Sequence, residues 1–138
     1  MSADLNRARA LLESQGYTCV LVGGNHVYTS NDRGVKPLLA WLSQGVCVKG
    51  FCAADKVVGK ATAFLYCLLG IRAVYTPVIS HSAAQVLRDH GIELTAGVEV
   101  DFIWNRRRTA PCPMETAVKD IQNPDDALTA IRETLKTL

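Results

Sequence analysis

Residues 48–75 read VKGFCAADKVVGKATAFLYCLLGIRAVY, and this stretch decides the fold. The apolar runs Val48–Ala53 and Ile71–Tyr75 predict two buried strands. The segment between them predicts a helix that runs from Asp55, as its capping residue, to about Leu69. Strands that alternate with helices along a chain indicate a sheet covered by helices. The stretch therefore predicts an α/β protein.

The flanking sequence adds the remaining elements. Before this stretch we expect a helix that Gly16 ends. Strands at Thr18–Val22 and His26–Thr29 should follow, joined by positive-φ residues in Gly23-Gly24-Asn25. The next predicted helix is capped by Asn31 or Asp32, has Pro37 in its first turn and ends at Gly45. After this stretch we expect a helix at Ser82–His90, an edge strand around Val98–Ile103, a short helix after Pro111 and a last helix opening at Asn123. This order predicts a three-layer α/β/α sandwich around a mixed sheet of about five strands, built by residues 1–138 as one domain.

Composition excludes several classes of protein. The chain has 138 residues, 49% of them hydrophobic and 20% charged, with a net charge of +2. These values exclude disordered, collagen-like and coiled-coil chains, and so small a charge excludes a nucleic-acid binder that works by bulk charge. The longest apolar stretch, Ala61–Val74, is too short to cross a membrane, and no signal peptide is visible. Five cysteines without metal-ligand spacing are expected to stay reduced, which indicates a cytoplasmic protein. We also expect no membrane contact and no cofactor.

Two junctions between a predicted strand and a predicted helix carry unexpected charges. They are Ser30–Lys36 and Ala54–Ala61, and ligands of α/β proteins gather at such strand ends. The positive end of a helix dipole favours acidic residues, yet these predicted first turns carry basic ones: Arg33, Lys36, Lys56 and Lys60. This arrangement is typical of an anion-binding site, although long basic side chains also point simply into solvent. Gly59, expected inside the second of these helices, fits close approach of a ligand or tight helix packing.

A second candidate is Cys112, which stands in a polar loop between three arginines, Arg106–Arg108, and a predicted helix start. Nearby cations and helix N-termini lower the pKa of a thiol and make it reactive. Glu115 is then a candidate proton-handling partner. The alternatives are an inert loop cysteine, and a solvated arginine loop that could instead touch RNA or a protein.

Several segments together carry a resemblance to a known family. They are Ser30–Leu39, Ala54–Ala61, Val74–Ser80, Asn105-Arg106 and Cys112–Glu115. In this order they resemble the bacterial and archaeal DUF1893 family over about residues 5–131. That family has no assigned biochemical function, and its members resemble the cytidine deaminase-like fold. The resemblance therefore implies a deaminase-like order of helices and strands.

The same comparison argues against zinc chemistry. Deaminases of this fold carry His-x-Glu or Cys-x-Glu at one helix start and Pro-Cys-x-x-Cys at the next. The matching positions here hold Asp32-Arg33-Gly34 and Asp55-Lys56-Val57-Val58, which offer no thiolate or imidazole. Pro111-Cys112 comes too late in the chain and lacks the second cysteine. We therefore expect no metal, and cations where zinc ligands would lie.

The leading hypothesis is a protein with a deaminase-like fold that binds an anionic, nucleotide- or phosphate-like small molecule at two helix N-termini and is not a zinc deaminase. A cysteine-dependent enzyme or redox-sensitive protein that uses Cys112 and Glu115 is the second hypothesis, and an RNA-associated or protein-interaction module is the third. Self-association through exposed Trp41 and Trp104 is a further expectation. The expected ligand-binding residues are Ser30, Arg33, Lys36, Asp55, Lys56, Gly59, Lys60, Asn105 and Arg106.

Overall fold

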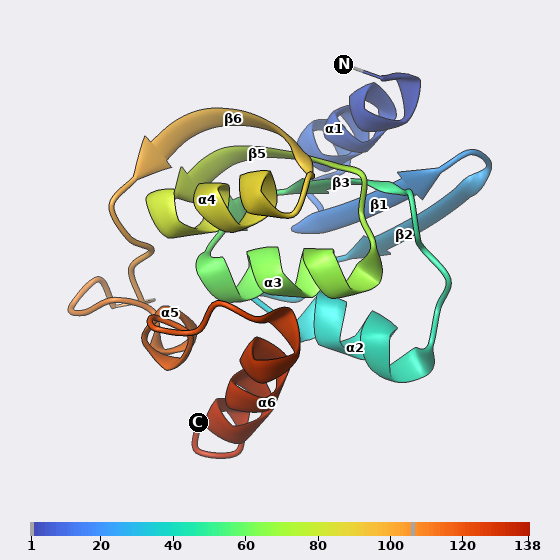
Figure 1. Cartoon of the computed structure of the whole chain (residues 1–138). Coiled ribbons are helices and arrows are strands. Elements are labelled where there is room, and N and C mark those ends of the chain that lie inside the picture. The colour runs from blue at the N-terminus through green and yellow to red at the C-terminus, as the bar shows by residue number, and fades with distance from the viewer. Residues whose placement is uncertain (1, 106) are drawn as a thin grey trace.

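The computed structural model describes residues 2–105 and 107–138 of the chain. Six helices and six strands follow one another in these residues, and Figure 1 shows their arrangement. The helices are α1 (Ala3–Gln15), α2 (Lys36–Gln44), α3 (Lys60–Leu69), α4 (His81–Asp89), α5 (Pro113–Ala117) and α6 (Pro124–Leu135). The strands are β1 (Cys19–Gly23), β2 (His26–Ser30), β3 (Cys52–Asp55), β4 (Val57–Val58), β5 (Ala73–Ser80) and β6 (Glu93–Val100).

The strands form one mixed sheet. β1 lies antiparallel to β2 and to β3, whereas β3, β4 and β6 all lie parallel to β5. Helix α1 packs on one face of this sheet, and α3 and α4 cover the other, with α2, α5 and α6 against α3 (Figure 1). The three-layer α/β/α architecture with a mixed sheet is therefore confirmed.

Alternation of side chains along the strands divides the core between the two faces of the sheet. In β1, Val20 and Val22 face α1, while Cys19 and Leu21 belong to the larger cluster under α3. All four side chains are buried, because helices cover both faces. The continuous apolar run of β1 follows from this double covering.

A proline in the central strand explains why the sheet has more strands than expected. Cys52 pairs with Ala73 and Val57 with Val78, so β3 and β4 keep one register along β5. Lys56 comes opposite Pro77, which has no backbone N–H to donate, and the ladder is interrupted there. On the other side of β5, a Cβ on Gly97 would lie 2.6 Å from the Pro77 carbonyl oxygen. β3 and β4 are therefore two parts of one strand that is interrupted at Lys56.

Three predicted strands have wrong boundaries. The central strand was expected at Ile71–Tyr75, whereas β5 spans Ala73–Ser80, because its later residues pair with β4 and β6. Residues 48–51 form a turn in which the Phe51 amide donates to the Val48 carbonyl, so β3 begins at Cys52. The edge strand begins at Glu93 instead of Val98 and ends at Val100. Five of its eight residues are exposed, because β6 lies at the edge of the sheet and one face stays open. The apolar alternation that identifies a half-buried strand is therefore missing.

The predicted caps of α2 and α3 and the predicted place of Gly59 were also wrong, whereas the first hairpin turns at a positive-φ glycine as expected. α3 begins at Lys60 after Gly59, so Asp55 ends β3 and does not cap the helix. Gly59 therefore precedes the helix and does not interrupt it. α2 follows Val35, which makes no side-chain cap, in place of Asn31 or Asp32. In the first hairpin, Gly24 is the turn residue with positive φ, at 58°.

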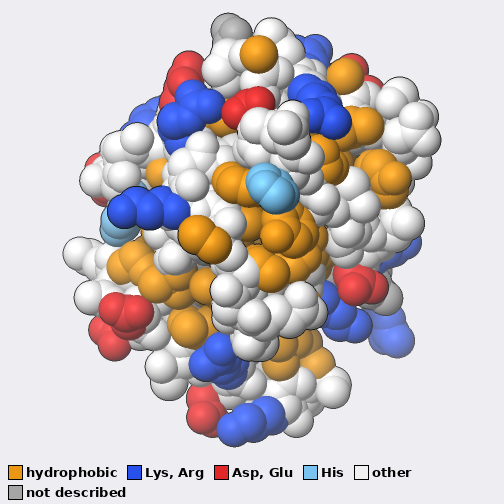
Figure 2. All heavy atoms as spheres, turned by 90° about the vertical axis from the view of Figure 1, so that its right-hand side faces the viewer, with side chains coloured by type: hydrophobic (Ala, Val, Ile, Leu, Met, Phe, Trp, Pro, Cys, Tyr) orange, Lys and Arg blue, Asp and Glu red, His pale blue; other side chains and the backbone are white. Residues whose placement is uncertain are grey.

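The side of the molecule at the right of Figure 1 is rich in apolar side chains, as Figure 2 shows. Tyr28 of β2 contacts the rings of Trp41 and Phe51, with centroids 6.0 and 6.2 Å away. Trp41 is only 8% exposed, so the expectation of an exposed indole there was wrong.

In the described residues, no helix combines the length and the apolar composition needed to cross a membrane.

Candidate functional site

Two neighbouring cavities share Glu115 in their linings, and the larger of this pair lies where the N-terminal ends of α2 and α3 approach the connection between β6 and α5. Its volume is about 1010 Å³. Polar and charged side chains from five segments line it, within residues 18–19, 32–36, 55–62, 103–107 and 112–115. Apolar side chains come from the same segments and from the C-terminal end of the chain. The lining includes Thr18, Cys19, Asp32, Arg33, Lys36, Asp55, Lys56, Gly59, Thr62, Ile103, Trp104, Asn105, Arg107, Cys112, Met114, Glu115, Leu135 and Leu138.

A buried hydrogen-bonded trio borders this cavity beneath β3 and β4. Cys19 and Asp55 are direct partners across β1 and β3, so both side chains point toward α3. There the Tyr66 hydroxyl donates to Asp55 Oδ2 over 2.7 Å. The Cys19 sulfur lies 3.2 Å from the same hydroxyl oxygen. When Asp55 is ionised, the single hydroxyl proton of Tyr66 goes to it, and the Cys19 thiol then donates to the Tyr66 oxygen.

Burial decides the protonation of the trio. It raises the pKa of Asp55 from 3.8 to about 7, although the Tyr66 hydroxyl and the Val57 and Lys56 amides act to lower it. Burial also raises the pKa values of Cys19 and Tyr66 well above their ordinary values. The thiol and the phenol therefore stay protonated at neutral pH. Asp55 is the group of the trio that can exchange a proton there.

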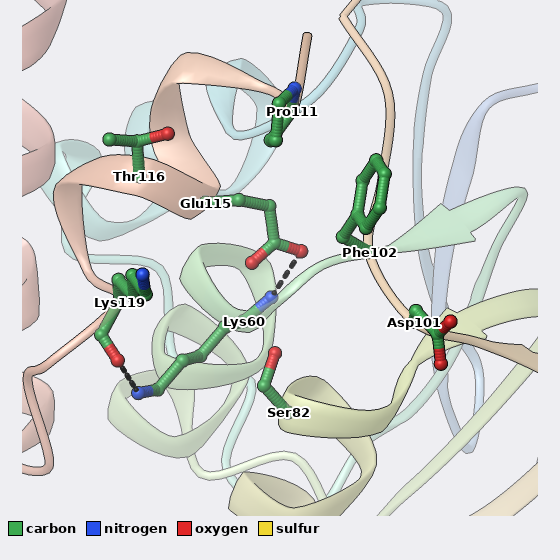
Figure 3. Close-up of a pocket in the computed structure, with 8 residues that line it drawn as sticks. All are labelled: Lys60, Ser82, Asp101, Phe102, Pro111, Glu115, Thr116 and Lys119. Carbon is green, nitrogen blue, oxygen red and sulfur yellow. Dashed lines mark hydrogen bonds between the residues drawn. The ribbon is translucent and has the colours of Figure 1, made fainter.

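Glu115 provides the cap that α3 does not make for itself. Its Oε1 accepts a hydrogen bond from the Lys60 backbone amide over 3.1 Å (Figure 3). Burial raises the pKa of Glu115, while the Lys60 amide and the Ser80 side chain lower it. A Cβ at Gly59 would come within 2.3 Å of the same Oε1. The glycine therefore makes room for a carboxylate that arrives from α5, 55 residues after Lys60 along the chain.

The smaller cavity, of about 420 Å³, lies on the other side of Glu115. Lys60 lines it, and its Nζ donates to the Lys119 carbonyl over 2.8 Å. Figure 3 shows Phe102 and Asp101 on the side of this cavity opposite Lys119. The Lys60 ammonium therefore turns away from the larger cavity.

Four cations remain in the lining of the larger cavity: Arg33, Lys36, Lys56 and Arg107. In residues 2–105 and 107–138, none of them forms an ion pair with a carboxylate. α2 has no acidic residue in its first turn and no side-chain cap, whereas α6 has both. The positive end of the α2 dipole therefore adds to a cationic rim.

The connection between β6 and α5 forms a closed loop beside the cavity. Trp104 pairs with Pro111 in an antiparallel bridge, and the Asn105 amide donates to the Ala110 carbonyl over 2.9 Å. The Asn105 side chain accepts from the Thr109 amide and donates to the Thr109 hydroxyl. Arg108 adopts a positive φ of 55° within this turn. Asn105 therefore lines the cavity, and the hydrogen bonds of its side chain to Thr109 stabilise the loop.

The structure brings together most of the residues that the sequence selected. Those in the lining of the larger cavity are Arg33, Lys36, Asp55, Lys56, Gly59, Asn105, Cys112 and Glu115. Lys60 lines the smaller cavity, and Ser30 is in neither lining because its hydroxyl accepts from the Asp32 amide in a local turn. Arg106 lies outside the described residues.

Sequence reasoning missed the Asp55–Tyr66–Cys19 trio and the apolar lining. Tyr66 stands in an apolar helical run that reads as core. Trp104 was selected as a contact between subunits, yet its half-exposed side chain lines the cavity.

The cysteines differ in exposure. Cys112 is half-buried in the lining of the larger cavity, Cys47 is exposed, and Cys19 and Cys52 are buried. Among the described residues, no three His, Cys, Asp or Glu side chains are placed to hold a metal ion.

Comparison with solved structures gives a strong match over the whole chain. A crystal structure of a DUF1893 family protein, TM1506 from Thermotoga maritima, superposes with a TM-score of 0.85. The two chains are 23% identical, and the match covers 100% of this chain and 92% of that one. At this level of identity, the similarity shows a shared fold.

A second solved structure is much less similar. It is a diaminohydroxyphosphoribosylaminopyrimidine deaminase/5-amino-6-(5-phosphoribosylamino)uracil reductase from the same organism, with a TM-score of 0.43 and 17% identity. The match covers 69% of this chain and 35% of that one, and a score this low does not define a common fold.

The sequence itself was compared with curated proteins and with family models. No curated protein matches it significantly. A family model described as TM1506, domain of unknown function (DUF1893), matches residues 7–135. Of the described residues that line the larger cavity, all except Leu138 lie in the matched segment. The chain therefore belongs to the DUF1893 family.

Proposed function

We propose that this protein binds an anionic small molecule, of the phosphate or nucleotide kind, in the larger cavity. The observation that carries the proposal is the set of four cations, Arg33, Lys36, Lys56 and Arg107, which line one cavity without carboxylate partners among the described residues. Cations that face one another repel unless an anion lies between them. An anionic ligand between the cations offsets that repulsion, and its attraction to the four positive charges stabilises the bound state.

Of the two helix N-termini in the hypothesis, α2 is the one that suits the ligand. The Lys60 amide at the start of α3 already donates to Glu115, so a carboxylate of the protein itself occupies that end. At α2, Arg33 and Lys36 flank a helix start without an acidic residue or a side-chain cap. Pro37 has no backbone N–H, and the Lys36 amide donates to the Arg33 carbonyl. The attraction for an anion at this helix start therefore comes from the two basic side chains and from the helix dipole. The anionic group of the ligand therefore binds between α2 and Lys56.

The test is ligand-dependent stability and calorimetry with inorganic pyrophosphate and AMP. A ligand at 100 times its Kd stabilises the folded state by about 2.7 kcal/mol, which is easily seen as a rise in Tm. Arg33→Ala and Lys56→Ala should each weaken binding at least about fivefold, as expected when one charged hydrogen bond of ~1–3 kcal/mol is lost. Both side chains are exposed, so neither change should lower the stability of the free protein appreciably.

Lys49→Ala is the matched control, because Lys49 is an exposed cation that lines neither cavity. It should leave the affinity unchanged. The proposal is wrong if neither anion raises Tm, or if all three variants weaken binding equally, since equal effects indicate attraction by net charge alone.

Cys112 supports the alternative of a cysteine-dependent activity, because it lines the same cavity as Asp55. Its partner in that hypothesis, Glu115, is engaged by the Lys60 amide. Alkylation of Cys112 that is fast in the free protein and blocked by pyrophosphate would favour this alternative. Alkylation no faster than that of exposed Cys47 argues against it.

A further inference from the structure

Trp104 is the large aromatic side chain in the wall of the larger cavity. It is 50% exposed, although an indole is among the side chains that gain most from burial. It shares the lining with Ile103 and Met114, so an apolar surface lies in the same cavity as the four cations. A phosphate or a small carboxylate has no group that can use this surface.

The indole is held in place before any ligand binds. The bridge between Trp104 and Pro111 fixes the backbone, and the Cys112 amide donates to the Ile103 carbonyl over 2.8 Å. Phe102 contacts the indole edge-to-face, with centroids 4.7 Å apart and an interplanar angle of 63°. An edge-to-face contact orients a ring without stacking on it. A side chain fixed in this way loses little conformational entropy when a ligand packs against it.

The size of the cavity agrees with a ligand much larger than phosphate. Its volume of about 1010 Å³ lies at the upper end of the range typical of small-molecule sites, ~300–1,000 Å³. Cations at the start of α2 and between β3 and β4, together with an aromatic wall, match a molecule with an anionic group at one end and a flat ring at the other.

We propose that the ligand is a phosphorylated aromatic heterocycle of nucleotide size, with its ring stacked on Trp104 and its phosphate among the cations near α2. This inference rests on the proposed function and names the class of ligand for the same site. Stacking on an aromatic side chain tolerates any base, since every base has a π-face. Replacing the indole by an aliphatic side chain should therefore weaken binding about 5- to 150-fold, which corresponds to ~1–3 kcal/mol.

The experiment compares AMP, GMP, CMP and UMP with ribose 5-phosphate, which carries the sugar and phosphate without a ring. Trp41→Phe leaves Trp104 as the sole tryptophan of the chain. In this variant, nucleotides should quench the indole fluorescence, and calorimetry should show at least one of them binding more than about tenfold tighter than ribose 5-phosphate. Trp104→Leu should abolish that preference, and Trp104→Tyr should keep most of it. Circular dichroism confirms that each variant is folded.

The outcomes separate this inference from the proposed function. If ribose 5-phosphate and pyrophosphate bind and depend on Arg33 and Lys56, but nucleotides bind no better, the anion site stands and the stacking inference is wrong. The inference is also wrong if Trp104→Leu leaves nucleotide affinity unchanged. If none of these anions binds, both proposals are wrong.

Discussion

The contact between Gly59 and Glu115 allows a quantitative test of how α3 begins. In Gly59→Ala, the new Cβ would lie 2.3 Å from Glu115 Oε1 and 3.0 Å from Cδ. The backbone at Gly59 has φ −98° and ψ 174°, an extended conformation that alanine adopts without strain. The contact with Glu115 is therefore the local clash that the substitution introduces.

The expected cost is limited by what Glu115 loses when it moves. Its carboxylate is the end of a flexible side chain, so it can turn away from the new methyl group. The hydrogen bond from the Lys60 amide is then broken, and α3 is left without a cap. Loss of a helix N-cap costs ~0.5–2 kcal/mol, so we expect a fall of about 1–2 kcal/mol in the free energy of unfolding. For a chain of this length, that lowers Tm by roughly 3–8 °C.

A double-mutant cycle measures this coupling by urea denaturation. The variants are Gly59→Ala, Glu115→Ala and the double substitution. Because the methyl group has no carboxylate to displace once Glu115 is gone, the double variant should be less destabilised than the two single effects combined, by ~1 kcal/mol. The intrinsic preference for glycine over alanine at an N-cap is present in both backgrounds and cancels. Additive effects, within ~0.3–0.5 kcal/mol, would refute the capping role of Glu115.

Three further predictions concern other parts of the molecule. Because burial raises the folded-state pKa of Asp55 from 3.8 to about 7, its protonated form contributes stability at about pH 4 that is lost as the pH rises through 7. The unfolding free energy of wild type relative to Asp55→Asn should therefore fall from about pH 4 to about pH 8 in urea melts, and a flat difference contradicts the shift. Gly97→Ala places a Cβ 2.6 Å from the Pro77 carbonyl and should cost ~1–3 kcal/mol, because backbone cannot move aside; a neutral effect means that β6 shifts freely. In the native protein, mass spectrometry should find Cys47 alkylated quickly and Cys19 only after unfolding, and equal rates argue against burial of Cys19.

Local sequence patterns predicted most helices and the first hairpin. Gly16, Gly45 and Gly70 end helices in the left-handed conformation, with φ between 68° and 76°. Asn123 caps α6 through the amides of Asp125 and Asp126. These features depend on a few neighbouring residues, and therefore the sequence shows them directly.

The N-terminus of α3 could not be predicted in the same way. Asp55 has the residue type and the place of a cap, yet the chain continues through Val57 and Val58 as a strand, because both residues pair with β5. The cap comes instead from Glu115, and Gly59 leaves space for it. Pairing with a distant strand and approach of a distant side chain leave no local pattern in the sequence.

The sequence by itself determined the α/β architecture and identified the cationic residues near two helix starts, because hydrophobic periodicity, glycine positions and charges are local properties. Only the tertiary structure decided which of these residues meet. It turns Lys60 toward Lys119, buries Asp55 beside Tyr66 and Cys19, and brings Trp104 to the wall of the cationic cavity. The physical reason is that burial and contact depend on how sheet and helices pack. A side chain's pKa and its access to a ligand therefore follow from neighbours that lie far away along the chain.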